Sequence, residues 1–134
     1  MQPKTSALYS TTTVPELFLS AFKAFPDRIA LADSNQQLTY REVAAKSFQI
    51  AHLLKLKGMK RQDTVALLLS NNIDSLVTLI AVQLLGLRYI SLHPMASESD
   101  HCFVLQDAQA RMLIADGIKF HERVRALYQK NPIE

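Results

Sequence analysis

The chain of 134 residues has the length of one domain or of part of one. Hydrophobic residues make up 49% and charged residues 20%, so the chain can bury a core and is not typical of disordered proteins. The formal net charge is only +3, and Lys and Arg are scattered along the sequence, which argues against a nucleic-acid-binding protein. The single cysteine, Cys102, provides neither a disulfide framework nor the ligand spacing of a zinc site.

The N-terminal residues 1–12 are predicted to be a flexible lead, and they lack the apolar stretch of a signal peptide. The longest apolar stretch, residues 75–87, is too short to cross a bilayer and predicts a buried helix. We therefore expect a cytoplasmic protein with no transmembrane segment. Peripheral membrane contact leaves no mark that can be recognised in the sequence.

The first predicted helix opens with Thr13 and Glu16, which have the spacing of a capping box, and Pro26 ends it. Its aromatic residues recur at helical spacing and are predicted to lie in the core: Phe18, Phe22 and Phe25. Residues 28–33 predict a strand that pairs with residues 37–39 in a short hairpin.

A second capping box, Thr39 with Glu42, predicts a helix that ends at Gly58. From residue 64 onward, strands and helices alternate. The predicted strands are 64–69, 88–92 and 112–115, and the helices run from Asn71 or Asn72 to Gly86, from Ser97 to about Asp107, and from Ile118 to Lys130. This alternation predicts an α/β fold, an open three-layer parallel sheet with flanking helices, plus the N-terminal hairpin.

Ligands of open parallel sheets bind at the carboxyl ends of the strands, which here carry residues 70–72, 93–94 and 116–117. A phosphate-binding loop needs closely spaced glycines, but the three glycines are far apart, so neither a P-loop nor a dinucleotide fingerprint is present. A phosphoacceptor domain would need clustered acidic residues at the strand ends, where only Asp116 stands.

The histidines have competing interpretations. His93 either faces a ligand at the end of its strand or hydrogen-bonds to a local carbonyl, and we favour the second. His101 and Cys102 are adjacent in a predicted helix and point in different directions, so we expect a buried thiol beside a histidine on the helix face rather than a catalytic dyad. Surface positions are expected for the remaining histidines and for the basic cluster of the last helix: His52, His121, Arg123, Arg125 and Lys130.

An ordered series of segments resembles the N-terminal part of AMP-forming acyl-CoA synthetases and related adenylating enzymes. Residues 25–31 resemble the opening strand of that family, and residues 38–43 resemble its first core motif, Leu-Thr-Tyr-x-Glu-Leu. Residues 63–67 are similar to its Gly-Asp-x-Val-Ala strand entry, with Gln62 where glycine is common. Residues 84–94 resemble its second core motif, and residues 107–116 the following helix-to-strand segment.

Two departures from the second core motif bear on the subfamily. Leu84 and Leu85 stand where the family usually has Lys-Ala, and His93 stands where it has Asp. The ending Leu-His-Pro, followed by an acidic run and His101, looks more like the fatty-acyl and aryl-acyl CoA ligase branch than the amino-acid-activating branch of peptide synthetases.

The resemblance implies that a full-length parent adenylates a carboxylic acid with ATP and Mg²⁺ and then transfers the acyl group to CoA. Residues 13–134 would be its N-terminal α/β subdomain, lacking the phosphate loop and the C-terminal domain, and inactive without the remainder of the ligase. No catalytic or metal-binding residue carries over to this chain, and no cofactor is expected to bind it alone. The matching motif positions are mainly structural in the family: Leu38, Thr39, Tyr40, Glu42, Gly86, Tyr89, His93 and Pro94.

Two alternatives stay open at this point. The chain could be a stand-alone, non-catalytic binding or interaction module, which would use an exposed apolar face to form a homodimer or to hold an acyl chain. It could also be an unrelated flavodoxin-like binder of a small ligand.

Overall fold

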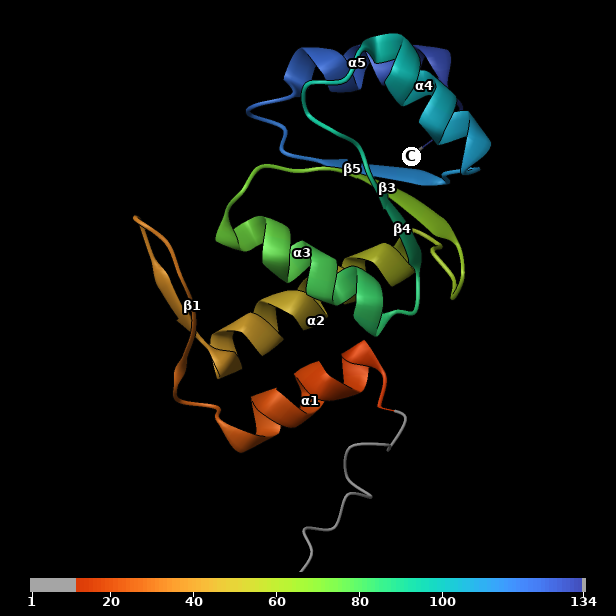
Figure 1. The fold of residues 1–134 in the computed structure, drawn as a ribbon. Helices are drawn as coiled ribbons and strands as arrows, with labels where there is room; N and C mark the ends of the chain where they lie inside the picture. The colour runs from red at the N-terminus through yellow and green to blue at the C-terminus, as the bar shows by residue number, and fades with distance from the viewer. Residues whose placement is uncertain (1–11, 134) are drawn as a thin grey trace, which may run out of the picture.

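The computed structural model describes residues 12–133 and shows five helices and five strands in that range (Figure 1). In chain order they are α1 (Val14–Ala24), β1 (Ile29–Ala32), β2 (Gln37–Thr39), α2 (Tyr40–Leu56), β3 (Thr64–Leu68), α3 (Ile73–Leu84), β4 (Arg88–Ser91), α4 (Glu98–Asp107), β5 (Met112–Ala115) and α5 (His121–Lys130). Within residues 12–133, none of the helices is long and apolar enough to span a membrane.

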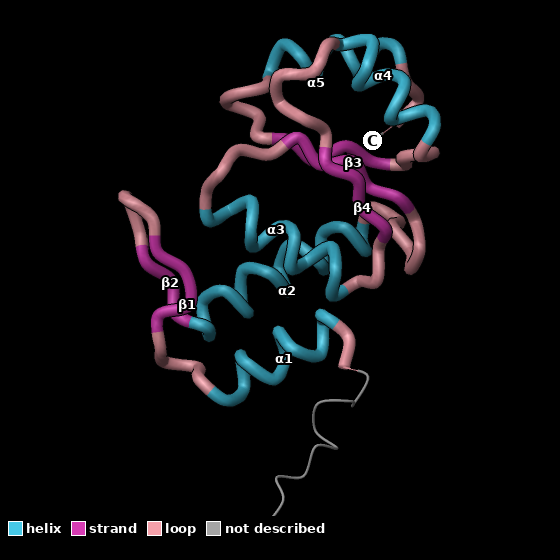
Figure 2. Tube along the Cα trace, in the orientation of Figure 1, coloured by secondary structure: helices cyan, strands magenta, loops and turns pink. Residues whose placement is uncertain are grey.

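Three parallel strands form the main sheet in the order β4-β3-β5, with Val65 of β3 in register with Tyr89 on one side and Met112 on the other. Helices α2 and α3 lie on one face of this sheet and α4 and α5 on the other, while α1 packs outside α2 and α3 (Figures 1 and 2). Strands β1 and β2 pair separately as an antiparallel hairpin. The predicted three-layer α/β fold with an N-terminal hairpin is therefore confirmed.

The central strand is buried on both faces, as its continuous apolar sequence predicts. Because successive side chains of a strand point to opposite faces, Val65 and Leu67 pack toward α2 and α3 with Leu54 and Val82. The alternate residues pack toward α4 and α5, where the core contains Ala66, Leu68, Leu92, Leu105 and Leu127.

Both predicted capping boxes form. The side chain of Thr39 accepts from the backbone N–H of Glu42, whose carboxylate in turn accepts from the N–H of Thr39 at 2.8 Å. Thr13 and Glu16 make the same exchange at the start of α1. These reciprocal bonds satisfy N–H groups that a helix terminus leaves without partners, which is why the boundaries were predictable.

Three helices are followed by a residue with a left-handed backbone conformation, and in two of them this residue is glycine. Gly58 and Gly86 follow the ends of α2 and α3, as predicted. Both adopt positive φ, and the N–H of the next residue returns to the helix. After α4 the same position is held by Gln109, at φ 51. Gln62, which stands where the resembling family commonly has glycine, is also left-handed, at φ 70. These two glutamines adopt a conformation that glycine takes without steric cost.

Helix α5 begins later than predicted, at His121 rather than Ile118. The carboxylate of Asp116 accepts hydrogen bonds from the backbone N–H groups of Ile118 and Lys119, at 3.1 and 3.2 Å, and holds them in a turn. The predicted strand 28–33 is shorter in the structure, where β1 covers Ile29–Ala32 and its pairing with β2 is irregular between Ile29 and Leu31. Of the predicted lead, residues 1–11 lie outside the described residues.

The aromatic residues of α1 are less buried than predicted. Phe18 and Phe22 are half-buried against Leu38, Val43 and Val77, but Phe25 is 46% exposed. It follows the last residue of the helix, and its ring contacts the ring of Tyr40 and the guanidinium of Arg28.

Candidate functional site

The carboxyl edge of the sheet brings together polar residues from two strand ends. The hydroxyl of Ser70, after β3, donates to Asp116, after β5, at 2.6 Å. This bond, followed by the N–H groups of Lys119 and Ile118, lowers the pKa of the Asp116 carboxyl. Asn72 caps α3 by accepting from the N–H and the hydroxyl of Ser75, both at 2.9 Å. These polar groups therefore bind each other and the backbone of the turns.

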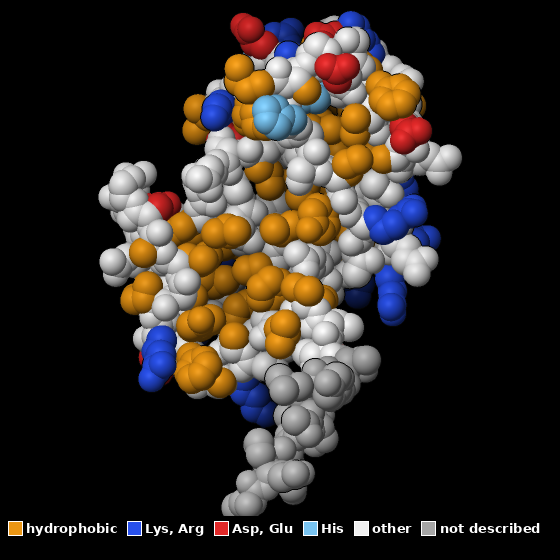
Figure 3. Space-filling model, in the orientation of Figure 1, with side chains coloured by type: hydrophobic (Ala, Val, Ile, Leu, Met, Phe, Trp, Pro, Cys, Tyr) orange, Lys and Arg blue, Asp and Glu red, His pale blue; other side chains and the backbone are white. Residues whose placement is uncertain are grey.

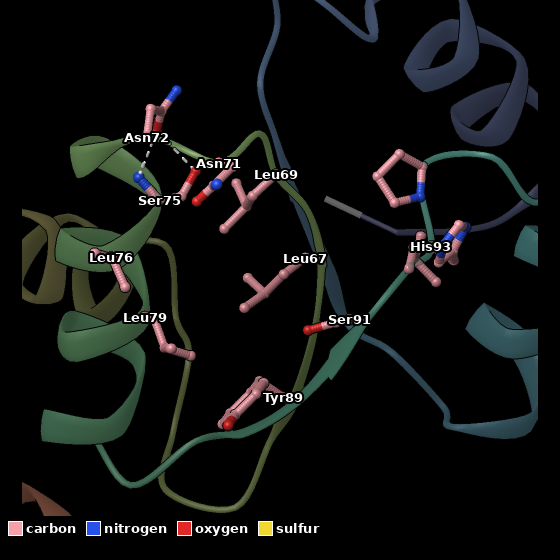
Figure 4. Close-up of a pocket in the computed structure, with 12 residues that line it drawn as sticks. Leu67, Leu69, Asn71, Asn72, Ser75, Leu76, Leu79, Tyr89, Ser91 and His93 are labelled. Carbon is pink, nitrogen blue, oxygen red and sulfur yellow. Dashed lines mark hydrogen bonds between the residues drawn. The ribbon is translucent and has the colours of Figure 1, made fainter. Parts of the chain in front are cut away.

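An open hollow of ≈ 460 Å³ lies beside this edge, between α3 and β4 (Figure 4). In Figure 4, Leu76 and Leu79 of α3 line one wall and Leu67 and Leu69 line the wall formed by the central strand. Tyr89 and Ser91 border it from β4, and beyond them His93 and Pro94. The walls are mostly apolar, with polar groups grouped toward the carboxyl end, an arrangement found in pockets for small amphiphilic molecules.

His93 was predicted either to face a ligand or to hydrogen-bond to a local carbonyl, and its position has features of both. Its ring Nδ1 accepts a hydrogen bond from the backbone N–H of Met95 at 3.2 Å, so the local partner is an amide and not the expected carbonyl. The side chain is also exposed and lines the hollow. The backbone of the loop that contains His93 is held by a hydrogen bond with the buried side chain of His101.

The structure corrects the prediction for His101 and Cys102. His101 is 1% exposed, whereas Cys102 is only half-buried. The Ser97 cap sets the phase of α4 so that His101 and Leu105, one turn apart, face the sheet. Nε2 of His101 lies 2.8 Å from the carbonyl oxygen of His93, and Nδ1 lies 2.9 Å from Nη1 of Arg123. Arginine only donates and a carbonyl only accepts, so the imidazole has its proton on Nε2.

The prediction of a surface position for Arg123 is also wrong, because its side chain is half-buried. Its Nη1 donates to the carbonyl oxygen of Ala96 at 2.9 Å as well as to His101. His101 and Arg123 thus tie α4, α5 and the loop at 93–96 together. Arg125 is exposed as expected, and Lys130, also exposed, pairs with Glu98.

The positions that match the family motifs lie at three separate places. Leu38, Thr39, Tyr40 and Glu42 are at the junction of the hairpin with α2, where Leu38 is in the core and Thr39 and Glu42 form the cap. Gly86 is at the turn before β4. Only Tyr89, His93 and Pro94 come together, at the hollow.

The described residues offer little chemistry of their own. Residues 12–133 contain no group of three or more His, Cys, Asp or Glu side chains placed to hold a metal ion. Gly58 and Gly86 end helices rather than cradle an anion, and His52 and His121 are exposed as predicted. The network of His101 and Arg123 was missed, although the four-residue spacing of His101 and Leu105 on a capped helix could have indicated that the histidine faces inward.

Comparison with known proteins gives a consistent result. The model of a family described as AMP-binding enzyme matches residues 18–133. Tyrocidine synthase 3 of Brevibacillus parabrevis is 32% identical over 111 residues, which cover 82% of this chain and 2% of the synthase. The 2-succinylbenzoate–CoA ligase of Bacillus velezensis is 34% identical over 106 residues, which cover 78% of this chain and 22% of the ligase.

Among solved structures, the N-terminal subdomain of Klebsiella oxytoca NpsA in complex with 3-hydroxybenzoyl-AMSN superimposes with a TM-score of 0.79 and 27% identity. The similarity covers 87% of this chain and 29% of that one. The chain therefore spans a small part of the proteins that it resembles.

Proposed function

The chain belongs to the AMP-binding enzyme family, and we propose that it forms the N-terminal α/β subdomain of a ligase that activates a carboxylic acid as its acyl-adenylate. The observation that carries this proposal is the family match over residues 18–133, which includes the whole of the three-layer unit. Membership in this family removes the basis for the flavodoxin-like alternative.

The geometry supports a scaffolding role for this unit. The motif residues Thr39, Glu42 and Gly86 fix helix ends, and the polar groups at the carboxyl edge of the sheet are engaged in turns and caps. Phosphate binding, Mg²⁺ coordination and proton transfer then require residues outside this chain. In the full enzyme, ATP with Mg²⁺ would supply the adenylate, and the residues of this subdomain would hold the fold that presents it.

For the second half-reaction we propose transfer of the acyl group to CoA, as in the fatty-acyl and aryl-acyl branch. The support is the Leu-His-Pro ending of the second core motif, with His93 in place of Asp. Identities of 34% to a CoA ligase and 32% to a peptide synthase do not separate this branch from the amino-acid-activating one.

The test uses the whole protein that contains this chain. Pyrophosphate exchange is measured with aliphatic, aromatic and amino acids, and thioester formation is then measured with CoA. We expect exchange with an aliphatic or aromatic acid and a CoA thioester as product. Exchange confined to amino acids, with no CoA thioester, would contradict the branch but keep the family chemistry.

The isolated chain of 134 residues is the matched control and is expected to show no exchange with any acid. Robust exchange by that chain would contradict the subdomain proposal, because it would require a complete active site within these residues.

A second candidate function is a non-catalytic interaction module that dimerises through its apolar face. Hydrophobic side chains gather over α3 and the region toward α1 (Figure 3), and among the exposed ones are Leu76 at 46% and Tyr89 at 45%. A dimer by sedimentation, dissociated by Leu76→Ser with Tyr89→Ser, would support this function. A monomer that binds no hydrophobic dye would remove its basis.

A further inference from the structure

The amino ends of the sheet strands carry a basic surface that the proposed function does not use. Lys55, Lys60 and Arg61 line one shallow depression with Leu85, at the end of α2 and in the loop before β3. Arg88, at the start of β4, donates from Nε to the carbonyl oxygen of Gln62 at 2.8 Å, which places it beside this loop. Figure 3 shows Lys and Arg side chains gathered on the side where, in Figure 1, the loop from α2 to β3 lies.

Little negative charge balances this surface. Between residues 55 and 63 the only carboxylate is Asp63, and Arg111 binds it at 2.5 Å. None of the three ion pairs in the described part of the chain involves the cations at this end: Lys55, Lys57, Lys60, Arg61 and Arg88. We name these five residues the basic surface. Burying them against an apolar partner would cost more than it returns, since each charge would lose its hydration.

Two exposed leucines of α2 stand next to the basic surface. Leu53 is 58% exposed and Leu56 is 70% exposed, and they are neighbours on the outward side of the helix, three residues apart. Leu53 also lies one turn before Lys57, on the same side of the helix. Helices that lie in a membrane interface have this composition, with exposed apolar side chains next to several lysines.

We propose that this end of the molecule, the basic surface with Leu53 and Leu56, docks onto a lipid bilayer that contains anionic headgroups. Five cations spread over the end of α2, the loop after it and the start of β4 match an extended negative surface better than one small anion. The leucines would enter the headgroup region while the cations bind phosphates. Nucleic acid is the poorer match, because its phosphate backbone offers nothing to the leucines and the basic surface has no aromatic residue for base stacking. The proposal does not depend on the enzymatic activity proposed above.

The experiment is co-sedimentation of the whole protein with vesicles of phosphatidylcholine alone and with vesicles in which about a third of the lipid is phosphatidylglycerol. We expect binding to the second kind only, strong at about 0.1 M salt and lost near 1 M, where screening shortens the range of the charges. Equal binding to both kinds of vesicle, or none to either, would overturn the proposal.

Two double variants locate the surface. Lys57→Gln with Lys60→Gln is expected to weaken binding roughly 30-fold, at about fivefold for each cation. Leu53→Ser with Leu56→Ser is expected to weaken it at least about 10-fold, because the leucines lose their apolar contact with lipid. Both pairs are exposed, so the fold, checked by circular dichroism, is expected to survive.

The matched control is Lys119→Gln with Arg125→Gln, which removes the same charge from the region of α5, across the sheet. It is expected to bind like the wild type. Equal weakening by the control would overturn the proposal, since attraction would then follow net charge alone. Comparable binding to a DNA duplex, unaffected by the leucine variant, would overturn it in favour of a nucleic-acid partner.

Discussion

The two helical layers that cover the sheet differ in the polar side chains that they bury. Most buried side chains of α2 and α3 are apolar. The buried polar ones are Ser47 and Thr78, whose hydroxyls donate to the backbone carbonyl oxygens of Val77, at 3.4 Å, and Asp74, at 2.7 Å. On the other face, His101 of α4 and Asn131 at the end of α5 are buried polar residues. His101 hydrogen-bonds to the carbonyl oxygen of His93, and Oδ1 of Asn131 accepts a hydrogen bond from Gln106 of α4 at 3.4 Å.

This difference shows where an apolar pattern suffices and where it does not. A layer of leucines and valines is held by packing that tolerates any partner of suitable shape. A layer with a buried imidazole is stable only if each polar atom meets its partner, which fixes α4, α5 and the loop at 93–96 in one arrangement. The second layer therefore gains specificity at the risk of larger losses when a partner is removed.

The largest expected effects come from removing core leucines and should be alike in the two layers. Leu54→Ala and Leu127→Ala each remove a nearly fully buried side chain, so each is expected to lower the free energy of unfolding by roughly 2–5 kcal/mol. Urea denaturation of both variants measures this. A loss confined to one layer would show that the two do not unfold together.

Replacing buried polar side chains should lower stability by different amounts in the two layers. His101→Leu leaves the carbonyl oxygen of His93 without its partner and removes one of the two acceptors of the Arg123 guanidinium, at a cost of about 1–3 kcal/mol. Ser47→Ala in the other layer is the control and should cost less than about 1 kcal/mol, since its one hydrogen bond is long. Equal losses in thermal denaturation would refute the distinction between the layers.

The helix ends test the backbone separately from packing. Gln109→Gly is expected to raise the free energy of unfolding by up to about 1 kcal/mol, because it relieves a left-handed residue after α4. Gly58→Ala places a side chain at φ 84, where no atom crowds it, and should lower stability by about 1 kcal/mol through the backbone alone. If Gln109→Gly destabilises the protein, the glutamine side chain contributes more than its backbone strain costs.

The smallest expected effect is on the pH dependence of stability, through Ser70 and Asp116 at the carboxyl edge of the sheet. The Ser70 hydroxyl helps to keep the pKa of Asp116 below its ordinary value, so their interaction stabilises the fold above the ordinary pKa and is lost as the pH falls through the folded pKa. Ser70→Ala should raise the pKa of Asp116, as followed by carboxyl NMR. Its destabilisation should be greatest near neutral pH, and a deficit that grows toward acid pH would contradict this sign.

Sequence patterns were sufficient to predict the fold class, the element order, two capping boxes and the helix ends at Gly58 and Gly86. These features depend on residues close together in the chain, such as Thr39 with Glu42, and on apolar periodicity that follows from helix and strand geometry. The motif series likewise pointed to the correct family, since residues 18–133 match it.

Contacts between polar residues of distant segments could not be predicted in this way, because they depend on how the helices and strands pack. His101 and Arg123 are 22 residues apart, and the contact between them exists because α4 and α5 pack on the same face of the sheet. In the same way, Arg88 and Arg111 are distant in sequence, yet both flank Thr64 at the amino ends of the parallel strands. Local patterns encode the elements, but contacts between distant residues depend on how those elements pack, and packing is a property of the whole fold.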